Sequence, residues 1–295
     1  MSSAEKAASV LPELESEDFR VLQAIELGMA SFEYVPFDEI VKYANLNPSE
    51  VEFRISELNK RDFLYGQPGP YVGYILNYTG YDCLALNALV KADVLEALGK
   101  SLGVGKEADV YEALTPDERR VAVKFNRLGR TSFRETRRKR GYVADRRHVS
   151  WLYQSRLAAE REYEALRIVK SADVSAPEPL HQNRHVVVMS YIDGYNLADV
   201  DRLDDPEGFL NDILQNIRST LKAGVVHTDL SEFNIVVQTD GKVLLIDWPQ
   251  FVTSDHPNAN TLLRRDVYNV LRYFNRKYGL ERDLDETLMF VKSIA

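Results

Sequence analysis

The sequence predicts an α+β protein in two parts, and three observations lead to this prediction. Residues 1–83 hold three segments with the apolar period of a helix, followed by two short strand-like runs. Residues 101–192 begin with alternating strand-like segments beside two glycines, after a helical linker expected over 84–100. Residues 193–295 contain an Asp-Gly hairpin and helical stretches. We therefore expect a small helical module, a strand-rich lobe and a reduced, mixed C-terminal lobe.

Composition bounds the class of protein. Apolar residues make up 45% of the 295 residues, which is enough for a sizeable core. No apolar run approaches the roughly 18 residues of a transmembrane helix, so no membrane partner is expected. The N-terminus lacks the basic start and apolar stretch of a secretory signal. Cys83 is the only cysteine, which excludes an internal disulfide and a cysteine-based zinc site and indicates a reducing, cytoplasmic location.

Charge is unevenly distributed along the chain. The net charge is 37 − 45 = −8, and residues 1–100 alone hold 8 basic and 16 acidic residues. Within the balanced remainder, "RLGRTSFRETRRKRGYVADRR" (127–147) has nine basic residues and two acids. We interpret 127–150 as a flexible basic loop that contacts polyanions such as nucleotide phosphates or RNA, with a plain solvated loop as the alternative.

The first 83 residues predict a winged helix. Helical patterns cover 16–29, with Ser16 as a candidate N-cap, then 35–46, then 47–64 with Pro48 at the start. A hairpin around Pro-Gly-Pro follows, although a generic helical bundle shares this pattern. The third helix carries four acids and three bases over 49–63, so it is not a basic recognition surface. Docking to protein or to a ribonucleoprotein is therefore at least as well supported as direct base reading.

Two glycines precede the first long strand pair. Gly103 and Gly105 have G-x-G spacing, and two strands joined by a turn at "TPDER" would fold them over a phosphate chain. Without β-carbons, their backbone N–H groups can approach a ligand closely. The third glycine of the usual protein-kinase loop is replaced by Ala108, and no P-loop string occurs.

A lysine within an apolar strand indicates a buried ion pair. Lys124 lies in "VAVKF", where an ammonium group needs an acid or a ligand, unless the strand exposes it at an edge. Glu162 is the carboxylate on the apolar face of 154–170, whereas Glu160 and Glu164 fall on more polar faces. We expect a Lys124–Glu162 pair that directs the lysine toward nucleotide phosphates; an ordinary surface salt bridge is the alternative.

Residues 184–194 read as a buried strand that ends in a connector after Met189. Such a segment can offer its backbone to adenine, although an ordinary core strand has the same pattern.

The polar loop "HTDLSEFN" (227–234) suggests phosphoryl-transfer chemistry. Asp229 and Asn234 lie five positions apart, and the Asp-Gly hairpin returns Asp247 close to Asn234. The amide and the second acid can share magnesium, while Asp229 can accept a hydroxyl proton. We assign His227 a structural role. Turn chemistry alone does not explain this spacing together with Lys124, Glu162 and the glycines.

These motifs resemble those of protein kinases. "HTDLSEFN" resembles the catalytic loop, with Thr228 where arginine is usual, and "IDW" resembles the metal loop. "GVGKEADVY" and "VAVKF" are similar to the shortened phosphate loop and lysine strand of the RIO atypical kinases. With a winged helix in front, the sequence resembles the second RIO subfamily in its compact archaeal-like form. The resemblance implies a winged helix followed by a truncated bilobal kinase-like domain (lobes 101–192 and 193–295), serine/threonine kinase or ATPase activity, and use of ATP with magnesium or manganese.

The resemblance also implies residue roles. Asp229 would be catalytic together with Lys124, and Asn234 and Asp247 would hold the metal. Asp247 could also carry an aspartyl-phosphate, and Ser132 would be autophosphorylated. The ATP-binding set would comprise Gly103, Val104, Gly105, Lys106, Glu107, Val110, Lys124, Glu162, Met189, Ser190 and Ile192.

The family acts in maturation of the small ribosomal subunit. The resemblance therefore implies a pre-small-subunit particle of protein and rRNA as partner, contacted through the basic loop or the winged helix; oligomeric state is not indicated. Only 48 residues follow Asp247, without an A-P-E string, so poor binding of peptide substrates is expected. Arg264, Arg265 and Asp266 either brace the catalytic loop or line a plain surface helix.

Two other functions fit parts of the sequence. One is a winged-helix regulator whose second domain binds ATP without catalysis. The other is a small-molecule phosphotransferase of the aminoglycoside or choline type, against which the winged helix and the basic insertion argue.

Overall fold

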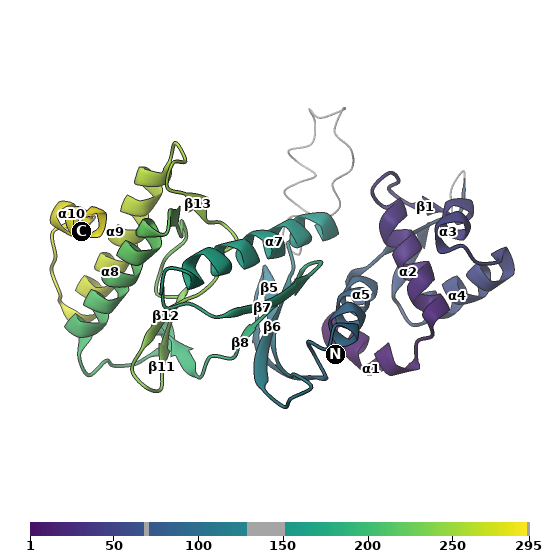
Figure 1. Ribbon diagram of the computed structural model, residues 1–295, viewed down its shortest axis with the longest axis horizontal. Coiled ribbons are helices and arrows are strands. Elements are labelled where there is room, and N and C mark those ends of the chain that lie inside the picture. The colour runs from purple at the N-terminus through teal and green to yellow at the C-terminus, as the bar shows by residue number, and fades with distance from the viewer. Residues whose placement is uncertain (68–70, 129–150, 294–295) are drawn as a thin grey trace. The chain divides into compact units, whose positions relative to one another are not determined.

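The computed structural model describes residues 1–67, 71–128 and 151–293 (Figure 1). These residues form two compact units. The first comprises Met1–Leu157 with Gln182–Val186, and the second comprises Ala158–His181 with Val187–Ala295. Each unit is described by itself.

The N-terminal module of the first unit is a winged helix, as the sequence predicts. Three helices are followed by a hairpin, and a short strand completes a three-stranded antiparallel sheet of order β1-β3-β2. Two further helical segments precede this set. The elements are α1 (Ser3–Val10), η1 (Leu11–Glu13), α2 (Ser16–Gly28), β1 (Val35–Pro36), α3 (Phe37–Ala44), α4 (Pro48–Lys60), β2 (Leu64–Gln67), β3 (Gly73–Leu76) and α5 (Tyr78–Lys91).

The N-cap of α2 differs from the sequence prediction. The cap is Glu15, not Ser16, because the Asp18 carboxylate accepts a 2.9 Å bond from the Glu15 N–H in a capping box. The Ser16 hydroxyl instead donates to Glu17 at 2.8 Å. The apolar stripe is confirmed, since Phe19, Leu22 and Ile25 are buried.

The linker helix is shorter than predicted. A helix over 84–100 is wrong beyond Lys91, where α5 ends. Asp93 has a left-handed backbone with φ of 53°, which stops the helix, and the Val94 N–H bonds back to the Leu89 carbonyl at 3.0 Å. The chain then enters a strand at Ala97.

A five-stranded sheet follows, of order β4-β5-β6-β8-β7. The pairs β4–β5 and β5–β6 are antiparallel, and a turn over 115–119 joins the second pair as predicted. The β4 strand is irregular, with register shifts on both sides of Ser101. Its elements are β4 (Ala97–Val104), β5 (Ala108–Leu114), β6 (Arg120–Asn126), β7 (Pro179–Asn183) and β8 (Val186–Ser190), and α7 (Trp151–Lys170) lies between β6 and β7 in sequence.

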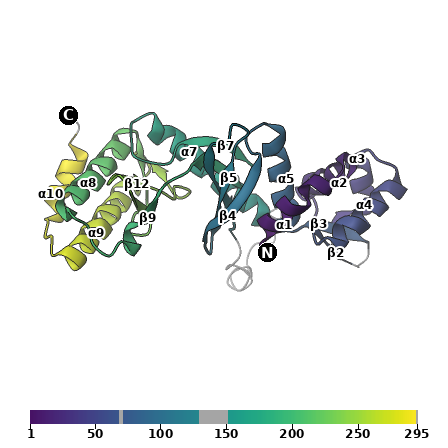
Figure 2. The same cartoon turned by 90° about the horizontal axis from the view of Figure 1, so that it is seen from below.

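The described C-terminal part of the second unit, residues 194–293, combines short sheets with the helices α8, α9 and α10. Its hairpin β11–β12 joins β9 in an antiparallel sheet of order β12-β11-β9, and β10 pairs with β13. The three helices pack against one another (Figure 2). The elements are β9 (Gly194–Asn196), η2 (Leu197–Asp199), α8 (Pro206–Lys222), β10 (Val225–Val226), β11 (Ile235–Gln238), β12 (Val243–Leu245), β13 (Val252–Thr253), α9 (Ala259–Tyr278) and α10 (Leu284–Lys292).

The predicted start of the basic loop, at residue 127, is wrong. Arg127, its first residue, is fully buried and ion-paired with Asp82 and Asp109. Residues 129–150 lie outside the described part of the chain. Because Arg127 stands next to a run of basic residues, the sequence predicts that it is solvated. Its two carboxylate partners come close to it only in the folded chain.

Among the described residues, no helix is both long and apolar enough to span a lipid bilayer.

Gly80 provides a test of how α5 packs against the hairpin. A β-carbon at Gly80 would lie 2.3 Å from the Phe63 carbonyl oxygen, so the backbone would have to shift. Although alanine is the better helix former, we expect Gly80→Ala to lower the free energy of unfolding by about 1–3 kcal/mol, measured by urea denaturation. The matched control is Val90→Ala on the exposed side of the same helix, expected to change it by less than about 0.5 kcal/mol. Equal effects of the two variants would contradict the close approach.

Candidate active site

The predicted phosphate loop is an exposed turn between two paired strands of the first unit. Gly103 and Val104 end β4, and the next three residues lead into β5. The turn is closed by a 2.8 Å bond from the Gly105 N–H to the Ala108 carbonyl. All five residues, 103–107, are exposed, and no atom outside the adjoining chain lies within 4 Å of the place where a Gly103 β-carbon would stand. A ligand can therefore approach this backbone closely.

Lys124 is buried in β6, with 7% of its surface exposed, so it does not occupy a solvent-facing edge. Its direct cross-strand partner is Val110, another residue of the predicted ATP-binding set. Glu162 is buried in α7 at 2% exposure, while Glu160 is intermediate and Glu164 exposed, as the helical period predicts. Lys124 and Glu162 belong to different compact units, so their pairing stays a prediction.

The predicted adenine-contacting segment is the end of β8. Met189 is buried and Ser190 is half-buried. The Ser190 N–H donates to the Glu178 carbonyl at 2.9 Å, and the Ser190 hydroxyl oxygen accepts from the Glu178 N–H at 2.9 Å. Of the Ser190 backbone groups, the carbonyl is therefore the one suited to meet a base, and Ile192 follows two positions later.

His227 has the structural role predicted for it. Its Nε2–H donates to the Ile246 carbonyl at 2.9 Å, and its ring packs 4.5 Å from that of Trp248. The Asp229 N–H points to Nδ1 at 3.4 Å. Both contacts fit a neutral imidazole that carries its proton on Nε2. The histidine thus fixes the loop rather than acting as a base.

The catalytic loop is anchored by α9. The Asp266 carboxylate accepts the Thr228 N–H at 2.7 Å and the Leu230 N–H at 3.1 Å, and the Arg265 guanidinium donates to the Thr228 carbonyl. These anchors flank Asp229, whose side chain is exposed. Arg265 and Asp266 therefore brace the loop, whereas Arg264 pairs with Asp285 at the surface.

Thr228 adopts a backbone conformation that β-branched residues rarely adopt. Its φ is 73°, and its hydroxyl donates to the Gln250 carbonyl at 2.8 Å. This hydroxyl anchor was missed by sequence reasoning, as was Asn269, whose amide donates to the Leu230 carbonyl at 3.2 Å. The available signal for Asn269 was its spacing from Arg265, since positions four apart share one helix face.

The structure brings Asp229, Asn234 and the start of the metal loop together, as predicted. The Asn234 side-chain N–H donates to the Asp229 carbonyl at 2.8 Å, and the Asn234 carbonyl accepts the Ile246 N–H at 3.0 Å. Asp247 comes next in the chain, with a left-handed φ of 69°. The β11–β12 register, with Ile235 opposite Leu245, produces this approach.

The donor set fits magnesium. The Asn234 amide nitrogen is occupied by Asp229, so its Oδ1 is the atom suited to a cation, next to the Asp247 carboxylate. Magnesium commonly binds through one or two protein oxygens plus substrate phosphates. Over the described ranges, no cluster of three or more His, Cys, Asp or Glu residues forms an independent metal cage. Ser132, the predicted autophosphorylation site, lies outside the described residues.

Comparisons with known proteins show the family of this chain. A model described as "RIO domain" matches residues 109–287, and one described as "Rio2, N-terminal" matches residues 11–92. The chain is 42% identical over 260 residues to the RIO-type serine/threonine-protein kinase Rio2 of Methanocaldococcus jannaschii, covering 86% of this chain and 94% of that protein. It is 37% identical to the Caenorhabditis elegans serine/threonine-protein kinase RIO2, covering 93% of this chain but 52% of the nematode protein.

A solved structure shares the fold over nearly the whole chain. The Rio2 kinase–ADP/Mg²⁺–phosphoaspartate complex from Chaetomium thermophilum superposes with a TM-score of 0.82 at 32% identity. The match covers 95% of this chain and 87% of the fungal chain.

The titration of the buried Asp266 carboxyl provides a test of the catalytic-loop geometry. Burial raises the pKa of its carboxyl from the ordinary 3.8 to about 6, with Asp229 acting in the same direction, against the N–H bonds from Leu230 and Thr228 and the positive charge of Arg265. The folded chain therefore binds this proton more tightly than the unfolded chain. The resulting stability is full below pH 3.8 and is lost as pH rises through 6.

We expect Asp266→Asn, which cannot titrate, to lack this dependence. Relative to the variant, the wild type should lose on the order of 3 kcal/mol of unfolding free energy between about pH 4 and pH 7. Chemical denaturation across this range measures the difference. Asp285→Asn on α10 serves as the exposed control. A wild-type-minus-variant difference that is independent of pH would contradict the raised pKa.

Proposed function

Because the chain belongs to the Rio2 group of the RIO family of serine/threonine-protein kinases, we propose that it binds ATP and magnesium and transfers the γ-phosphoryl group to serine, threonine or water. The observation that carries this proposal is the joining of Asp229 and Asn234 by a 2.8 Å bond, with Asp247 next to Ile246, which bonds to Asn234. The Rio2 kinase of Chaetomium thermophilum, solved with ADP and Mg²⁺, supports the choice of ligands.

Each polar residue has a proposed role. Asp229, exposed between two anchored neighbours, accepts the proton of the attacking hydroxyl. Asn234 and Asp247 hold magnesium, which when bound offsets phosphate charge. Lys124 contacts the α- and β-phosphates, and the exposed turn of residues 103–107 covers them. This division of roles is that of phosphoryl transfer by positioning and charge stabilisation.

Hydrolysis of ATP through Asp247 is part of the proposal. A carboxylate oxygen of Asp247 attacks the γ-phosphorus, and ADP leaves with the electron pair of the cleaved P–O bond. Water then cleaves the acyl phosphate to inorganic phosphate and regenerates the carboxylate. The phosphoaspartate in the fungal complex supports this route.

We place the protein on pre-small-ribosomal-subunit particles in the cytoplasm. Only residues 248–258 separate Asp247 from α9, which leaves little chain to grip a peptide, so a large assembly is the better substrate. The basic excess at 127–147 suits rRNA. Cys83 is buried, with burial raising the pKa of its thiol to about 12, and needs no oxidising compartment.

The catalytic assignment is tested with labelled ATP. We expect Asp229→Asn and Asp247→Asn each to lower the rate of phosphate transfer or hydrolysis at least about 100-fold, because each loses a charge needed in the transition state. Asp240→Asn, on the exposed turn of the same hairpin, is the matched control and should keep full activity.

Mapping the label then assigns its acceptor. Label on Ser132 that is absent from Ser132→Ala supports autophosphorylation there, and hydroxylamine-sensitive label absent from Asp247→Asn supports the acyl phosphate. A wild type that binds ATP but neither transfers nor hydrolyses its phosphate would leave the regulatory-module alternative.

The polyanion role of the basic segment has its own test. Changing Arg137, Arg138, Lys139 and Arg140 to glutamine should weaken RNA binding and reduce the slope of log affinity against log salt by as much as roughly 3. The control replaces Lys42 and Lys60, which are exposed on the N-terminal module and paired with acids, by glutamine. An unchanged slope in the first variant contradicts the role, and a reduced slope in the control moves the contact to the winged helix.

A further inference from the structure

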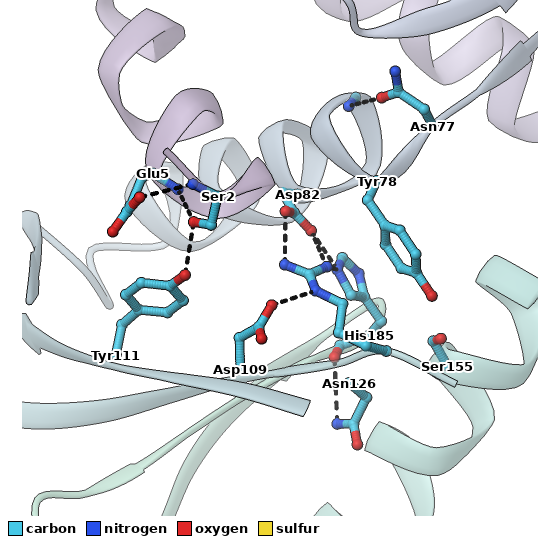
Figure 3. Close-up of polar contacts among 12 residues, drawn as sticks. Ser2, Glu5, Asn77, Tyr78, Asp82, Asp109, Tyr111, Asn126, Ser155 and His185 are labelled. Atoms are coloured by element: carbon cyan, nitrogen blue, oxygen red, sulfur yellow. Dashed lines mark hydrogen bonds and ion pairs between the residues drawn. The ribbon is translucent and has the colours of Figure 1, made fainter. Parts of the chain in front are cut away.

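Four ionisable side chains are completely buried where the N-terminal module meets the sheet of the first unit. Asp82 comes from α5, Asp109 from β5, Arg127 from the residue after β6, and His185 from the turn before β8. Figure 3 shows Asp82, Asp109 and His185 pointing toward one another. The solvent-exposed fraction of each of the four residues is 0%. No role in the chemistry proposed above uses them.

Arg127 is the centre of this cluster. Its two terminal nitrogens bind the Asp82 carboxylate at 2.5 and 2.8 Å, and its Nε donates to Asp109 at 3.0 Å. The guanidinium also lies 4.8 Å from the ring centroid of Tyr78. The planar fork of arginine can make these contacts at once, which the single ammonium of lysine cannot.

His185 completes the cluster on the side of Asp82. Its Nε2 lies 2.7 Å from an Asp82 oxygen and 3.0 Å from a terminal nitrogen of Arg127, and its ring stacks on Tyr81 at 4.5 Å. Burial alone would raise the pKa of Asp82, but Arg127 and the bond from His185 outweigh burial and lower it. Burial lowers the pKa of His185 itself. Two carboxyl groups therefore share one guanidinium, with a histidine ring nitrogen in contact with both Asp82 and Arg127.

Such a cluster is a poor way to gain stability. Removing charges from water is costly, and well-packed apolar residues often stabilise a core as well as a buried ion pair does. The cluster instead fixes orientation, because each of its hydrogen bonds constrains the position and angle of the group that it contacts.

The group that the cluster reaches is the phosphate loop. The backbone N–H of Arg127 donates to the Glu107 carbonyl at 2.6 Å, and Glu107 is the last residue of that loop. Two positions later, Asp109 accepts from the Arg127 side chain, and it pairs across the strands with Val104 of the loop. Arg127 therefore contacts the C-terminal arm of the loop once through its backbone and once through its side chain, and the side chain fixes the orientation of this arm through Asp109.

We propose that Arg127 is a positioning residue for the nucleotide phosphate loop, and that Asp82 of the N-terminal module holds Arg127 in the orientation that this requires. The proposal rests on the proposed function, since it concerns the same ATP site. It makes the winged-helix module a working part of ATP binding, in addition to any docking role.

The same unit offers a matched control. Arg184, in the turn before β8, binds Glu26 of α2 at 2.7 and 2.8 Å, so it also ties the N-terminal module to the sheet. None of its hydrogen bonds given by the structure reaches the phosphate loop. Arg184→Lys thus perturbs the module–sheet attachment without touching the loop.

The test compares two ligands that differ in their phosphates. Dissociation constants for Mg·ATP and for adenosine are measured by calorimetry on the full chain, well below each variant's melting temperature. We expect Arg127→Lys to weaken Mg·ATP binding about tenfold, because the side-chain bonds to Asp109 and Asp82 that orient the arm of the loop are lost while the backbone bond to Glu107 remains, and to leave adenosine binding within about twofold. Arg184→Lys should lower the melting temperature while leaving both constants within about twofold.

Asp82→Asn keeps the assay decisive if Arg127→Lys does not fold. The amide keeps the shape of the carboxyl but loses one acceptor, so the same selective loss of Mg·ATP affinity is expected. Unchanged Mg·ATP affinity, or an equal loss for both ligands, overturns the positioning role and leaves the proposed function intact. A wild type that does not bind Mg·ATP overturns the proposed function itself, and this inference with it.

Discussion

The interaction on which the candidate site depends is the acceptance of two catalytic-loop N–H groups by the buried carboxylate of Asp266. Between those two donors stands Asp229, and on its N-terminal side Thr228 is held with a positive φ. A chain in that conformation relaxes unless its surroundings fix it. The anchor explains how a segment rich in polar residues can stay ordered between two short strands while presenting one carboxylate to solvent.

The β11–β12 hairpin adds the residues proposed to bind magnesium to this anchored loop. Its Asp-Gly turn, with φ of 84° at Gly241, sets a register in which Ile246 bonds to Asn234. A shift of one residue would turn Asp247 to the opposite face of the hairpin. The same turn thus determines the geometry of the proposed cation site several residues away, and the left-handed backbone at Asp247 adds a second strained position beside Thr228.

The parts of this architecture that follow from local patterns were predictable from the sequence. The order of the winged-helix elements, the buried face of α7 with Glu162, and the hairpin that brings Asp247 to Asn234 all come from periodicity and turn chemistry. Arg127 was not predictable, because its partners Asp82 and Asp109 lie 45 and 18 positions away and a basic run reads as solvated. The end of α5 and the cap at Glu15 depend on one backbone angle and one reciprocal bond, which composition does not encode.

The two segments proposed to handle phosphates share a design, although they belong to different units. Each is held from behind by a buried ionic group: the Asp266 carboxylate, helped by the exposed Arg265, behind the catalytic loop, and Arg127 with Asp82 and Asp109 behind the phosphate loop. Apolar packing tolerates small slips because dispersion has no direction, whereas a buried carboxylate or guanidinium fixes both distance and angle. Burying these groups costs desolvation free energy, and they occur behind loops whose backbone geometry matters. Apolar packing holds the other elements together. Stability lost at these positions is thus the expected consequence of a site that depends on exact placement of backbone groups.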